Sequence, residues 1–370
     1  MNVLFVTRSY PPRKGGMEKF AFELQKHLAE FCSVSVISYS GPKILLPFIL
    51  PYFLARALWT FCFRRVNVVH LGDGVLAPLG WVLTFLKPVT ITVHGLDVVF
   101  SNPFYQFVIP RCLKRLHRII AVSECTRNEC LRRGIAPHRV VVVPDGVSDT
   151  LFLDVDRQVL KNEISRRLGI AIGDKKILLS VGRFVRRKGF DWFILNVVPR
   201  LLSRSKDWLY LLVGDGPLKE DIKEIIAQYA LGNRIYLLGS IDDSTLRLIY
   251  NASDIFVMPN VSITGDIEGF GIVAAEAASC RIPVVASDLA GISSHVVDGS
   301  IGFLVRPLDA MGFANAIHGL LEQDDLRTEI GENAKRFALS KFEWRQIAFR
   351  YLKEFALAAR VHQLKRHGAV

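Results

Sequence analysis

The chain has 370 residues, 50% of them hydrophobic, and a formal net charge of +12. Its length suits two domains that each bury a core, and its composition excludes a disordered protein. The segment after Met1 lacks the basic, apolar and small-residue order of a signal peptide. The six cysteines form no CxxC pair. We therefore expect a cytoplasmic protein with buried, reduced thiols.

Short apolar runs alternate with helical patterns along the whole chain, which is typical of parallel α/β architecture. Most runs are continuously apolar, as expected for strands covered on both faces of a sheet. The predicted strands are 3–7, 34–38, 68–70, 90–94, 119–123, 140–144, 177–181, 209–213, 235–238, 255–258 and 284–287. We predict two doubly wound, Rossmann-like domains that face each other across a cleft, with ligands at the carboxyl ends of the strands.

The predicted hinge lies between residues 146 and 175, where a basic helix at about 159–168 leads into the second sheet. An N-terminal domain is predicted for residues 1–160 and a C-terminal domain for residues 161–345. Residues 346–370 are predicted to form a helix that packs back on the N-terminal domain.

Residues 44–63 form an apolar stretch that is nominally long enough to cross a bilayer. Because Pro47 and Pro51 are expected to break it and Arg56 interrupts it, we favour a buried or interfacial helix over a transmembrane one. A plain core helix remains the alternative.

The positive charge is concentrated in the first half, where residues 1–150 carry 18 Lys and Arg against 9 Asp and Glu. Such an asymmetry indicates an anionic partner. Aromatic residues are not interleaved with the basic clusters, and no nucleic-acid-binding signature is present, so nucleic acid is not expected. We expect a peripheral protein on the inner face of the cell membrane, bound to its anionic surface.

Glu268 and Glu276 are separated by a glycine-rich turn and then by strong helix formers. On one helix they would lie about 12 Å apart along the axis, so we place Glu268 in a loop and begin the helix near Gly271. The backbone N–H groups at 270–272 would then attract phosphate. Carboxylates on either side of such a site are suited to bind the hydroxyls of a nucleotide sugar. The alternative is an acid at a helix start and an ordinary solvated helix face.

Two further segments follow strands and suit an anionic ligand. Gly15 and Gly16 link the first strand to a helix expected near Met17, which allows a close backbone approach to phosphate. Arg183 and Lys188 follow the first strand of the second domain, where both cations could neutralise one diphosphate. A basic, solvated loop is the alternative for this second segment.

The remaining candidates also lie at strand ends. Gly214 closes another strand of the second domain, and His94 ends a strand of the first domain, where it could bond a sugar hydroxyl. A structural histidine is the alternative for His94, and His70 and Asp73 are weaker candidates. No acidic pair or His/Asp/Glu cluster has metal-ligand spacing, so we expect no metal cofactor.

The motifs occur together in one order, which is Gly15-Gly16, His94, Arg183 with Lys188, and Glu268-x7-Glu276. This order resembles the retaining glycosyltransferases of family 4, which have the two-domain GT-B fold, over nearly the full length. Segments 10–16, 185–189 and 266–273 look most like the bacterial mannosyltransferases that act on phosphatidylinositol lipids. The stretch 342–344 looks like the family's C-terminal crossover helix.

The resemblance implies an acceptor-side N-terminal domain and a nucleotide-sugar-binding C-terminal domain. It assigns departing-phosphate stabilisation to Arg183 and Lys188, sugar contacts to His94 and Glu268, and the ribose hydroxyls to Glu276. The implied catalytic residues are His94, Arg183, Lys188 and Glu268. The implied donor-binding residues are Gly15, Gly16, Gly214, Gly269, Phe270, Gly271, Ile272 and Glu276. One departure is Asp145, which stands where many relatives have Asn.

The expected activity is the retaining transfer of a hexose, with mannose as the first choice, in cell-envelope glycan synthesis. The expected donor is GDP-mannose or a UDP-hexose, and the acceptor is lipid-linked or a polysaccharide. Front-face attack, in which the leaving phosphate takes the acceptor's proton, fits the absence of an obvious nucleophile. The alternatives are a nucleotide-sugar epimerase of the same architecture and a non-catalytic sugar-nucleotide-binding subunit.

Overall fold

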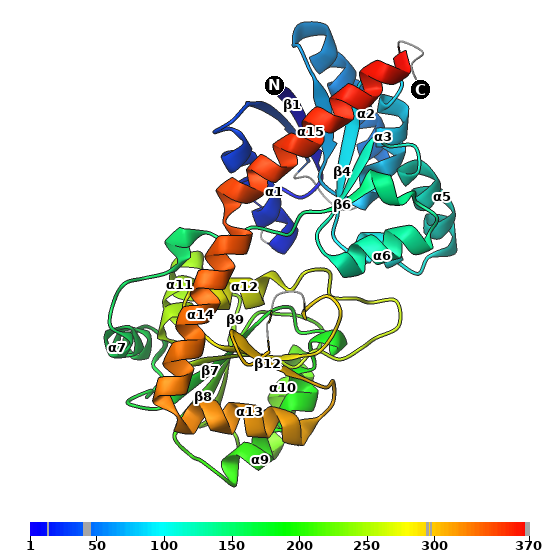
Figure 1. The fold of residues 1–370 in the computed structure, drawn as a ribbon. Helices are drawn as coiled ribbons and strands as arrows, with labels where there is room; N and C mark the ends of the chain where they lie inside the picture. Colours follow the sequence, from blue (N-terminus) through cyan, green and yellow to red (C-terminus); the bar gives the residue numbers. More distant parts are fainter. Residues whose placement is uncertain (13–14, 40–45, 294–295, 297, 367–370) are drawn as a thin grey trace. The chain divides into compact units, whose positions relative to one another are not determined.

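A computed structural model describes residues 1–12, 15–39, 46–293, 296 and 298–366, without the side chains of residues 46, 47, 365 and 366. The chain divides into two compact units (Figure 1). Unit 1 comprises Met1–Gly146, Gly265–Phe270 and the chain from Phe342 onward, and unit 2 comprises Val147–Thr264 and Gly271–Lys341. The first division falls at residue 146, before the predicted boundary at residue 160. The reason is that Leu160 and Ile164, on the helix predicted near this boundary, pack into the core of unit 2.

Unit 1 contains a six-stranded parallel sheet in the order β2-β1-β3-β4-β5-β6. Its strands are β1 (Asn2–Thr7), β2 (Ser33–Ser38), β3 (Val68–Leu71), β4 (Val89–Val93), β5 (Arg118–Ala121) and β6 (Val140–Val142). Its helices are α1 (Gly16–Leu28), α2 (Leu46–Phe63), η2 (Gly74–Leu76), α3 (Ala77–Leu83), α4 (Leu96–Val99), α5 (Pro103–Leu113), α6 (Glu124–Arg132), η3 (Pro137–Arg139) and α15 (Trp344–Arg366).

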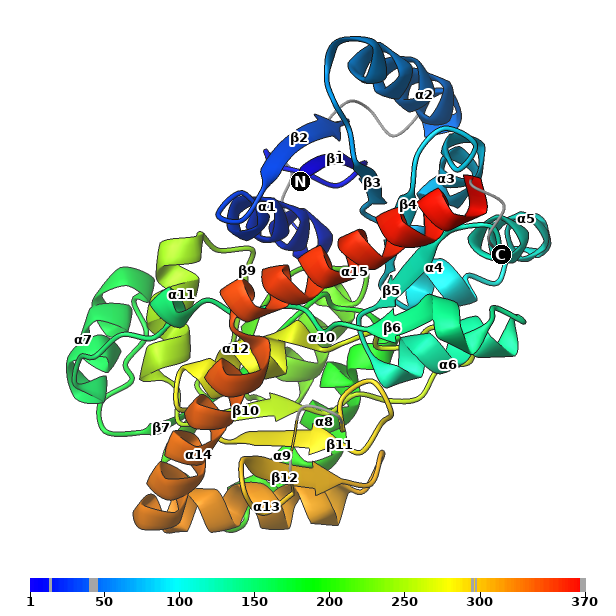
Figure 2. The ribbon, with the colours of Figure 1, turned by 45° about the horizontal axis from the view of Figure 1, so that its top comes forward.

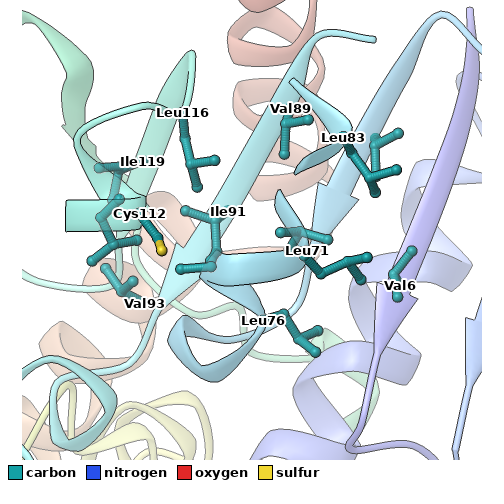
Figure 3. Packing of buried hydrophobic residues seen from close by; sticks show 14 of the residues in the cluster. Val6, Leu71, Leu76, Leu83, Val89, Ile91, Val93, Cys112, Leu116 and Ile119 are labelled. Carbon is teal, nitrogen blue, oxygen red and sulfur yellow. The ribbon is translucent and has the colours of Figure 1, made fainter. Parts of the chain in front are cut away.

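The alternation along β4 separates the two faces of this sheet. Val89, Ile91 and Val93 point into an apolar core with residues from α2, α3 and α5 (Figure 3). Thr90 and Thr92 occupy the other positions, and both hydroxyls hydrogen-bond the buried imidazole of His70 on β3. Burial lowers the pKa of His70 to about 3, so this imidazole is neutral. It is therefore a structural residue of the sheet.

The second face of the sheet is covered by α1 and α15 (Figure 2). Phe5 of β1 packs with Phe20 of α1 and with Tyr351 and Phe355 of α15. The hydroxyl of Tyr351 also lies 3.0 Å from Thr92 Oγ1. The C-terminal helix α15 therefore packs on the sheet of unit 1.

Helix α2 corrects the expectation that prolines break this segment. It is continuous over Leu46–Phe63 with Pro51 inside it. Ile49, Phe53 and Ala57 are spaced four residues apart and are buried in the core of unit 1, so packing offsets the one lost backbone hydrogen bond. Among the residues that the structure describes, no helix has the length and apolar character needed to cross a membrane.

Unit 2 contains a second six-stranded parallel sheet in the order β12-β11-β10-β7-β8-β9. Its strands are β7 (Lys176–Val181), β8 (Trp208–Val213), β9 (Ile235–Gly239), β10 (Ile255–Met258), β11 (Val284–Ser287) and β12 (Gly302–Val305). Its helices are η4 (Asp149–Leu151), α7 (Arg157–Leu168), η5 (Arg186–Lys188), α8 (Phe190–Asn196), α9 (Val198–Leu202), α10 (Lys219–Gln228), α11 (Asp243–Ala252), α12 (Ile272–Ser279), α13 (Ala310–Glu322) and α14 (Asp324–Phe342).

Strand β12 was not predicted from the sequence. It begins at Gly302, where a Cβ atom would lie 2.1 Å from the carbonyl oxygen of Val284 on β11. Close pairing of the two strands therefore requires a glycine, and glycine lowers the strand propensity of this short segment.

Candidate functional site

In unit 2, the carboxyl ends of β7 and β8 approach closely at two glycines. A Cβ atom on Gly214 would lie 2.0 Å from the carbonyl oxygen of Gly182, and Gly214 has a positive φ of 138°. Only glycine fits both conditions. The predicted residue Gly214 thus lies against the first turn after β7, at the sheet edge where ligands of doubly wound folds bind.

Lys188 lies at this same turn. It ends the 3-10 helix η5, and its side chain is buried, with 5% of the residue exposed. Its Cε and Nζ atoms lie 3.2 and 3.6 Å from the position of a Cβ atom on Gly182. The structure therefore brings the ammonium group of Lys188 to the carboxyl end of β7, whereas Arg183 is exposed. The alternative interpretation, a basic and solvated loop, is therefore wrong for Lys188.

Helix α12 begins where the sequence predicted. Gly271 is its N-cap with a φ of 71°, and Ile272 is its first residue. Glu276 is buried in the second turn, and its Oε2 atom accepts a hydrogen bond of 3.0 Å from the hydroxyl of Tyr250 on α11. Burial raises the pKa of Tyr250 well above its usual value, and the charge of Glu276 raises it further. The hydroxyl of Tyr250 therefore keeps its proton and donates it to Glu276 in this hydrogen bond. Because Glu276 is buried, the alternative interpretation that it lies on an ordinary solvated helix face is wrong.

In unit 1, His94 follows β4 and is half-buried. Its Nε2 atom lies 3.0 Å from the carbonyl oxygen of Gly72, so Nε2 carries a proton and donates it. Its ring packs edge-on against Phe20 at 4.8 Å. In the neutral tautomer this leaves Nδ1 as an acceptor for a hydroxyl group.

The two glycines before α1 have different surroundings. Gly15 is the N-cap of α1, and a Cβ atom there would lie 2.4 Å from a carboxylate oxygen of Glu18. Gly16 is exposed, and among the residues that the structure describes, no heavy atom beyond its chain neighbours would lie within 4 Å of a Cβ atom there. The space beside Gly16 is therefore open to a ligand.

The loop that carries Glu268 groups with unit 1. A Cβ atom on Gly269 would lie 1.9 Å from the carbonyl oxygen of His94, so only glycine fits at this approach. Phe270 is buried and packs edge-on against Phe342 at 5.5 Å. Within unit 1, the structure thus brings the Glu268 loop to His94, the residue that follows β4.

The predicted residues therefore occupy two sheet edges, one in each unit. Those in unit 1 are Gly15, Gly16, His94, Glu268, Gly269 and Phe270, and those in unit 2 are Arg183, Lys188, Gly214, Gly271, Ile272 and Glu276. The described residues contain no group of three His, Cys, Asp or Glu side chains arranged for a metal ion.

Sequence reasoning did not identify the residues that position His94. Asp97 accepts hydrogen bonds of 2.8 Å from the backbone N–H groups of both His94 and Gly74. Asp73, a weaker candidate from the sequence, instead caps the turn after β3 and pairs with Arg8 at 2.9 Å. An acidic residue just after a buried strand was the available signal. Tyr250 had no such signal, because it is one apolar-face residue within a helix.

Asp145 follows β6, and within the described part of the chain its Oδ1 atom is buried without a hydrogen-bond partner. Burial raises the pKa of Asp145 to about 6, although His94 acts in the opposite direction. The folded state thus holds a proton that the unfolded state loses near its ordinary pKa of 3.8. This carboxyl group therefore lowers stability progressively as the pH rises from about 4 to above 6.

We expect Asp145→Asn to stabilise the protein by about 1–3 kcal/mol at pH 8, because the amide needs no proton. The gain at pH 8 should exceed the gain at pH 5 by about 1 kcal/mol. Urea denaturation of both proteins at the two pH values measures this difference. An equal gain at both values would show that Asp145 titrates normally in the folded state.

Two family comparisons cover most of the chain. The family described as Glycosyltransferase Family 4 matches residues 14–151, and the family described as Glycosyl transferases group 1 matches residues 161–337. The first range contains strands β2 to β6 of unit 1, and the second contains strands β7 to β12 of unit 2.

Individual relatives are similar over long alignments. The chain is 25% identical over 374 residues to the GDP-mannose-dependent alpha-(1-6)-phosphatidylinositol monomannoside mannosyltransferase of Mycolicibacterium smegmatis, covering 93% of this chain and 95% of that protein. It is also 25% identical to the alpha-D-kanosaminyltransferase of Streptomyces kanamyceticus, covering 75% of this chain and 73% of that protein.

The structure of Anabaena HepE, determined in complex with UDP and glucose, has the same fold. It superposes with a TM-score of 0.79 at 20% identity and covers 96% of this chain and 99% of HepE. The predicted GT-B architecture is therefore confirmed. The two glycosyltransferase family models match consecutive parts of the chain, so the chain is a glycosyltransferase of the GT-B type.

Proposed function

We propose that the protein is a retaining glycosyltransferase that transfers a hexose, with mannose as the first choice, from a nucleotide diphosphate sugar. The acceptor is lipid-linked or a polysaccharide, and the reaction takes place on the inner face of the cell membrane. The observation that carries this proposal is the buried ammonium group of Lys188 at the glycine turn after β7. A buried cation at the carboxyl end of a parallel strand suits a diphosphate.

The donor assignment is supported by relatives. The Mycolicibacterium smegmatis mannosyltransferase is GDP-mannose-dependent and is similar along 93% of this chain. HepE binds UDP and UDP-glucose and shares the fold. A GDP-sugar is the first candidate because the similarity to the mannosyltransferase extends through both units, and a UDP-hexose is the second.

The proposed chemistry is front-face displacement at the anomeric carbon. The bond between this carbon and the diphosphate oxygen breaks, the acceptor oxygen bonds to the same face, and the acceptor's proton passes to the departing phosphate. Lys188 stabilises the charge on that phosphate, and exposed Arg183 reaches it once the donor is bound. His94 Nδ1 accepts a hydrogen bond from the sugar, and Glu268 binds its other hydroxyls. The reaction uses no metal ion.

Glu276 is proposed to accept hydrogen bonds from the ribose hydroxyls, with Tyr250 holding its carboxylate in place. We expect Glu276→Gln to raise the KM for the donor by about 10- to 100-fold with a smaller change in kcat, since bonds to a charged group contribute about 1.5–3 kcal/mol. Steady-state kinetics with varied donor measure this split. Glu220→Gln, on the exposed start of α10, is the matched control. An unchanged KM would remove Glu276 from the ribose site.

The reaction is tested by measuring nucleotide release from a panel of GDP- and UDP-sugars with a chelator, in the presence and absence of a bacterial lipid extract. Release from one donor that increases with lipid supports transfer and identifies the donor. Conversion of a donor without lipid and without free sugar would instead indicate an epimerase. Binding without any turnover across donors and acceptors would indicate a non-catalytic binding subunit.

A further inference from the structure

Unit 1 contains a cavity of about 900 Å³ that the proposed reaction does not use. It is lined by the ends of α3 and α5, by residues that precede β5 and β6, and by the last part of α15. Its lining includes Trp81, Phe85, Phe107, Arg111, Arg115 and Arg139.

This cavity lies at the amino-terminal edge of the sheet. His117 directly precedes β5, Arg139 directly precedes β6, and Phe85 lies between α3 and β4. His94 and Gly16 follow their strands and lie at the carboxyl-terminal edge. The cavity is therefore a second site, separate from the edge at which donor and acceptor react.

The charge of this cavity is entirely positive. Its lining includes Arg111, Lys114, Arg115 and Arg139 but no Asp or Glu. Between residues 40 and 118 the chain has nine Lys and Arg against two Asp and no Glu. Both aspartates, Asp73 and Asp97, are buried at the opposite edge of the sheet. Among the described residues that line the cavity, no acidic side chain therefore neutralises these cations.

Two of these arginines donate hydrogen bonds to backbone carbonyl oxygens of α5 or of the residues just after it. Arg139 donates hydrogen bonds to the carbonyl oxygens of Lys114 and Leu116, just beyond the end of α5. Arg111 bonds the carbonyl oxygen of Phe107 and lies 3.7 Å from the centre of its ring. Arg115 has no such bond within the described part of the chain, so its guanidinium is available to an anion at the cavity.

Aromatic side chains surround the same cavity. Trp81, Phe85 and Phe107 are 44, 72 and 59% exposed. Large apolar side chains that are exposed together in this way mark an interaction surface. Helix α3 also contacts α2, on which Trp59 and Phe63 are exposed. Figure 2 shows α2, α3 and α5 at this side of unit 1. Aromatic residues beside Lys and Arg are the combination found at membrane interfaces.

We propose that this cavity binds the head group of an anionic membrane lipid, with Trp81, Phe85 and Phe107 inserted at the level of the head groups. The anion enters the positive lining, and the apolar rings avoid water beside the acyl chains. A bilayer is favoured over nucleic acid because the exposed rings extend over α2, α3 and α5 and would remain in water beside a polyanion. The inference does not depend on the transfer reaction.

The test uses the full chain with vesicles of phosphatidylcholine alone or of phosphatidylcholine and phosphatidylglycerol in equal parts. One variant, Arg111→Glu with Arg115→Glu, reverses charge at the cavity, and another, Trp81→Ala with Phe85→Ala, removes two rings. The control, Arg200→Glu with Tyr229→Ala, changes an exposed cation and an exposed ring of unit 2. Co-sedimentation gives the partition coefficient, and circular dichroism with donor binding checks folding.

We expect the wild-type protein and the control to bind the anionic vesicles, with binding that weakens as salt rises. The charge-reversal variant should bind these vesicles at least about tenfold more weakly, since each basic residue near an anionic surface contributes about 1 kcal/mol. The ring variant should also bind at least about tenfold more weakly, because it loses the apolar area that the two rings bury at the head-group level. Quenching of tryptophan fluorescence by brominated lipid should decrease in the Trp81→Ala variant.

Three results would overturn the proposal. The first is equal partition of the wild-type protein to neutral and anionic vesicles, and the second is unchanged binding by the folded cavity variants. The third is a dimer in light scattering that the ring variant dissociates while its vesicle binding stays normal, which would make this face a contact between two copies. Because no step requires turnover, a failure here is distinct from a failure of the transferase proposal.

Discussion

Lys188→Ala is expected to lower the kcat of sugar transfer by at least ~100-fold, the usual effect of removing one preorganised charge-stabilising group. The ammonium group is buried at the turn after β7, so its orientation is fixed before the donor binds. A charge that develops on the departing phosphate would be neutralised there without rearrangement of water. Single-turnover rates with the donor identified by the panel measure the effect.

Two variants make this experiment specific. Lys188→Arg should recover little activity, because the Lys188 side chain is buried and a larger, planar guanidinium group would have to displace its neighbours. Lys206→Ala removes an exposed lysine of the same unit and should leave kcat unchanged. A folded Lys188→Ala protein with near wild-type kcat would contradict the site assignment.

Asp254→Ala is expected to destabilise unit 2 by about 3–5 kcal/mol, because it leaves buried charges without their partner. The Asp254 carboxylate lies before β10 with 2% of its side chain exposed. It pairs with Lys161 of α7 at 2.8 Å and with Arg157 at 3.2 Å, and it accepts a backbone hydrogen bond of 2.8 Å from Ile177 of β7. This one group therefore joins α7 to two central strands.

The pH dependence of this ion cluster has a definite sign. Burial alone would raise the pKa of Asp254, but the charges of Arg157 and Lys161 and the hydrogen bonds outweigh burial and lower it. The stabilisation is therefore present above the ordinary pKa of an aspartate and is lost as the pH falls through the lowered value. Asp254→Asn should remove this acid-dependent part of the stability.

Urea denaturation, followed by tryptophan fluorescence, to which the buried Trp208 in the core of unit 2 contributes, measures both Asp254 variants. Asp207→Asn, an exposed aspartate next to β8, is the matched control and should change the free energy of unfolding little. A loss below about 1 kcal/mol for Asp254→Ala would show that the cluster does not hold α7 to the sheet.

The strands could be predicted because each parallel sheet is covered on both faces. Runs such as 209–213 and 255–258 are continuously apolar, and each lies within an observed strand. The segment that forms β12 was missed because its pairing depends on Gly302 beside Val284, a contact between distant residues. Helix α2 likewise tolerates Pro51 through the burial of Phe53 and its neighbours, which a local proline rule does not include.

The parts of the site that depend on residues close together in the sequence could be predicted. The spacing of Glu268, Gly271 and Glu276 placed the start of α12 correctly, since an N-cap glycine followed by helix formers is a local signal. The burial of Lys188 and the hydrogen bond from Tyr250 to Glu276 were not predictable, because they depend on how separate strands and helices pack. The roles of these residues in catalysis stay predictions.

On the proposed function, the carboxyl edge of the unit 2 sheet binds a nucleoside diphosphate through Lys188 and Glu276. Isothermal titration of GDP, GMP, UDP and UMP into the wild-type, Lys188→Ala and Glu276→Gln proteins tests it most directly. We predict that one diphosphate binds at least about tenfold more tightly than its monophosphate, that Lys188→Ala loses this preference, and that Glu276→Gln weakens both nucleotides equally. Diphosphate binding that is unchanged in both folded variants would contradict the account.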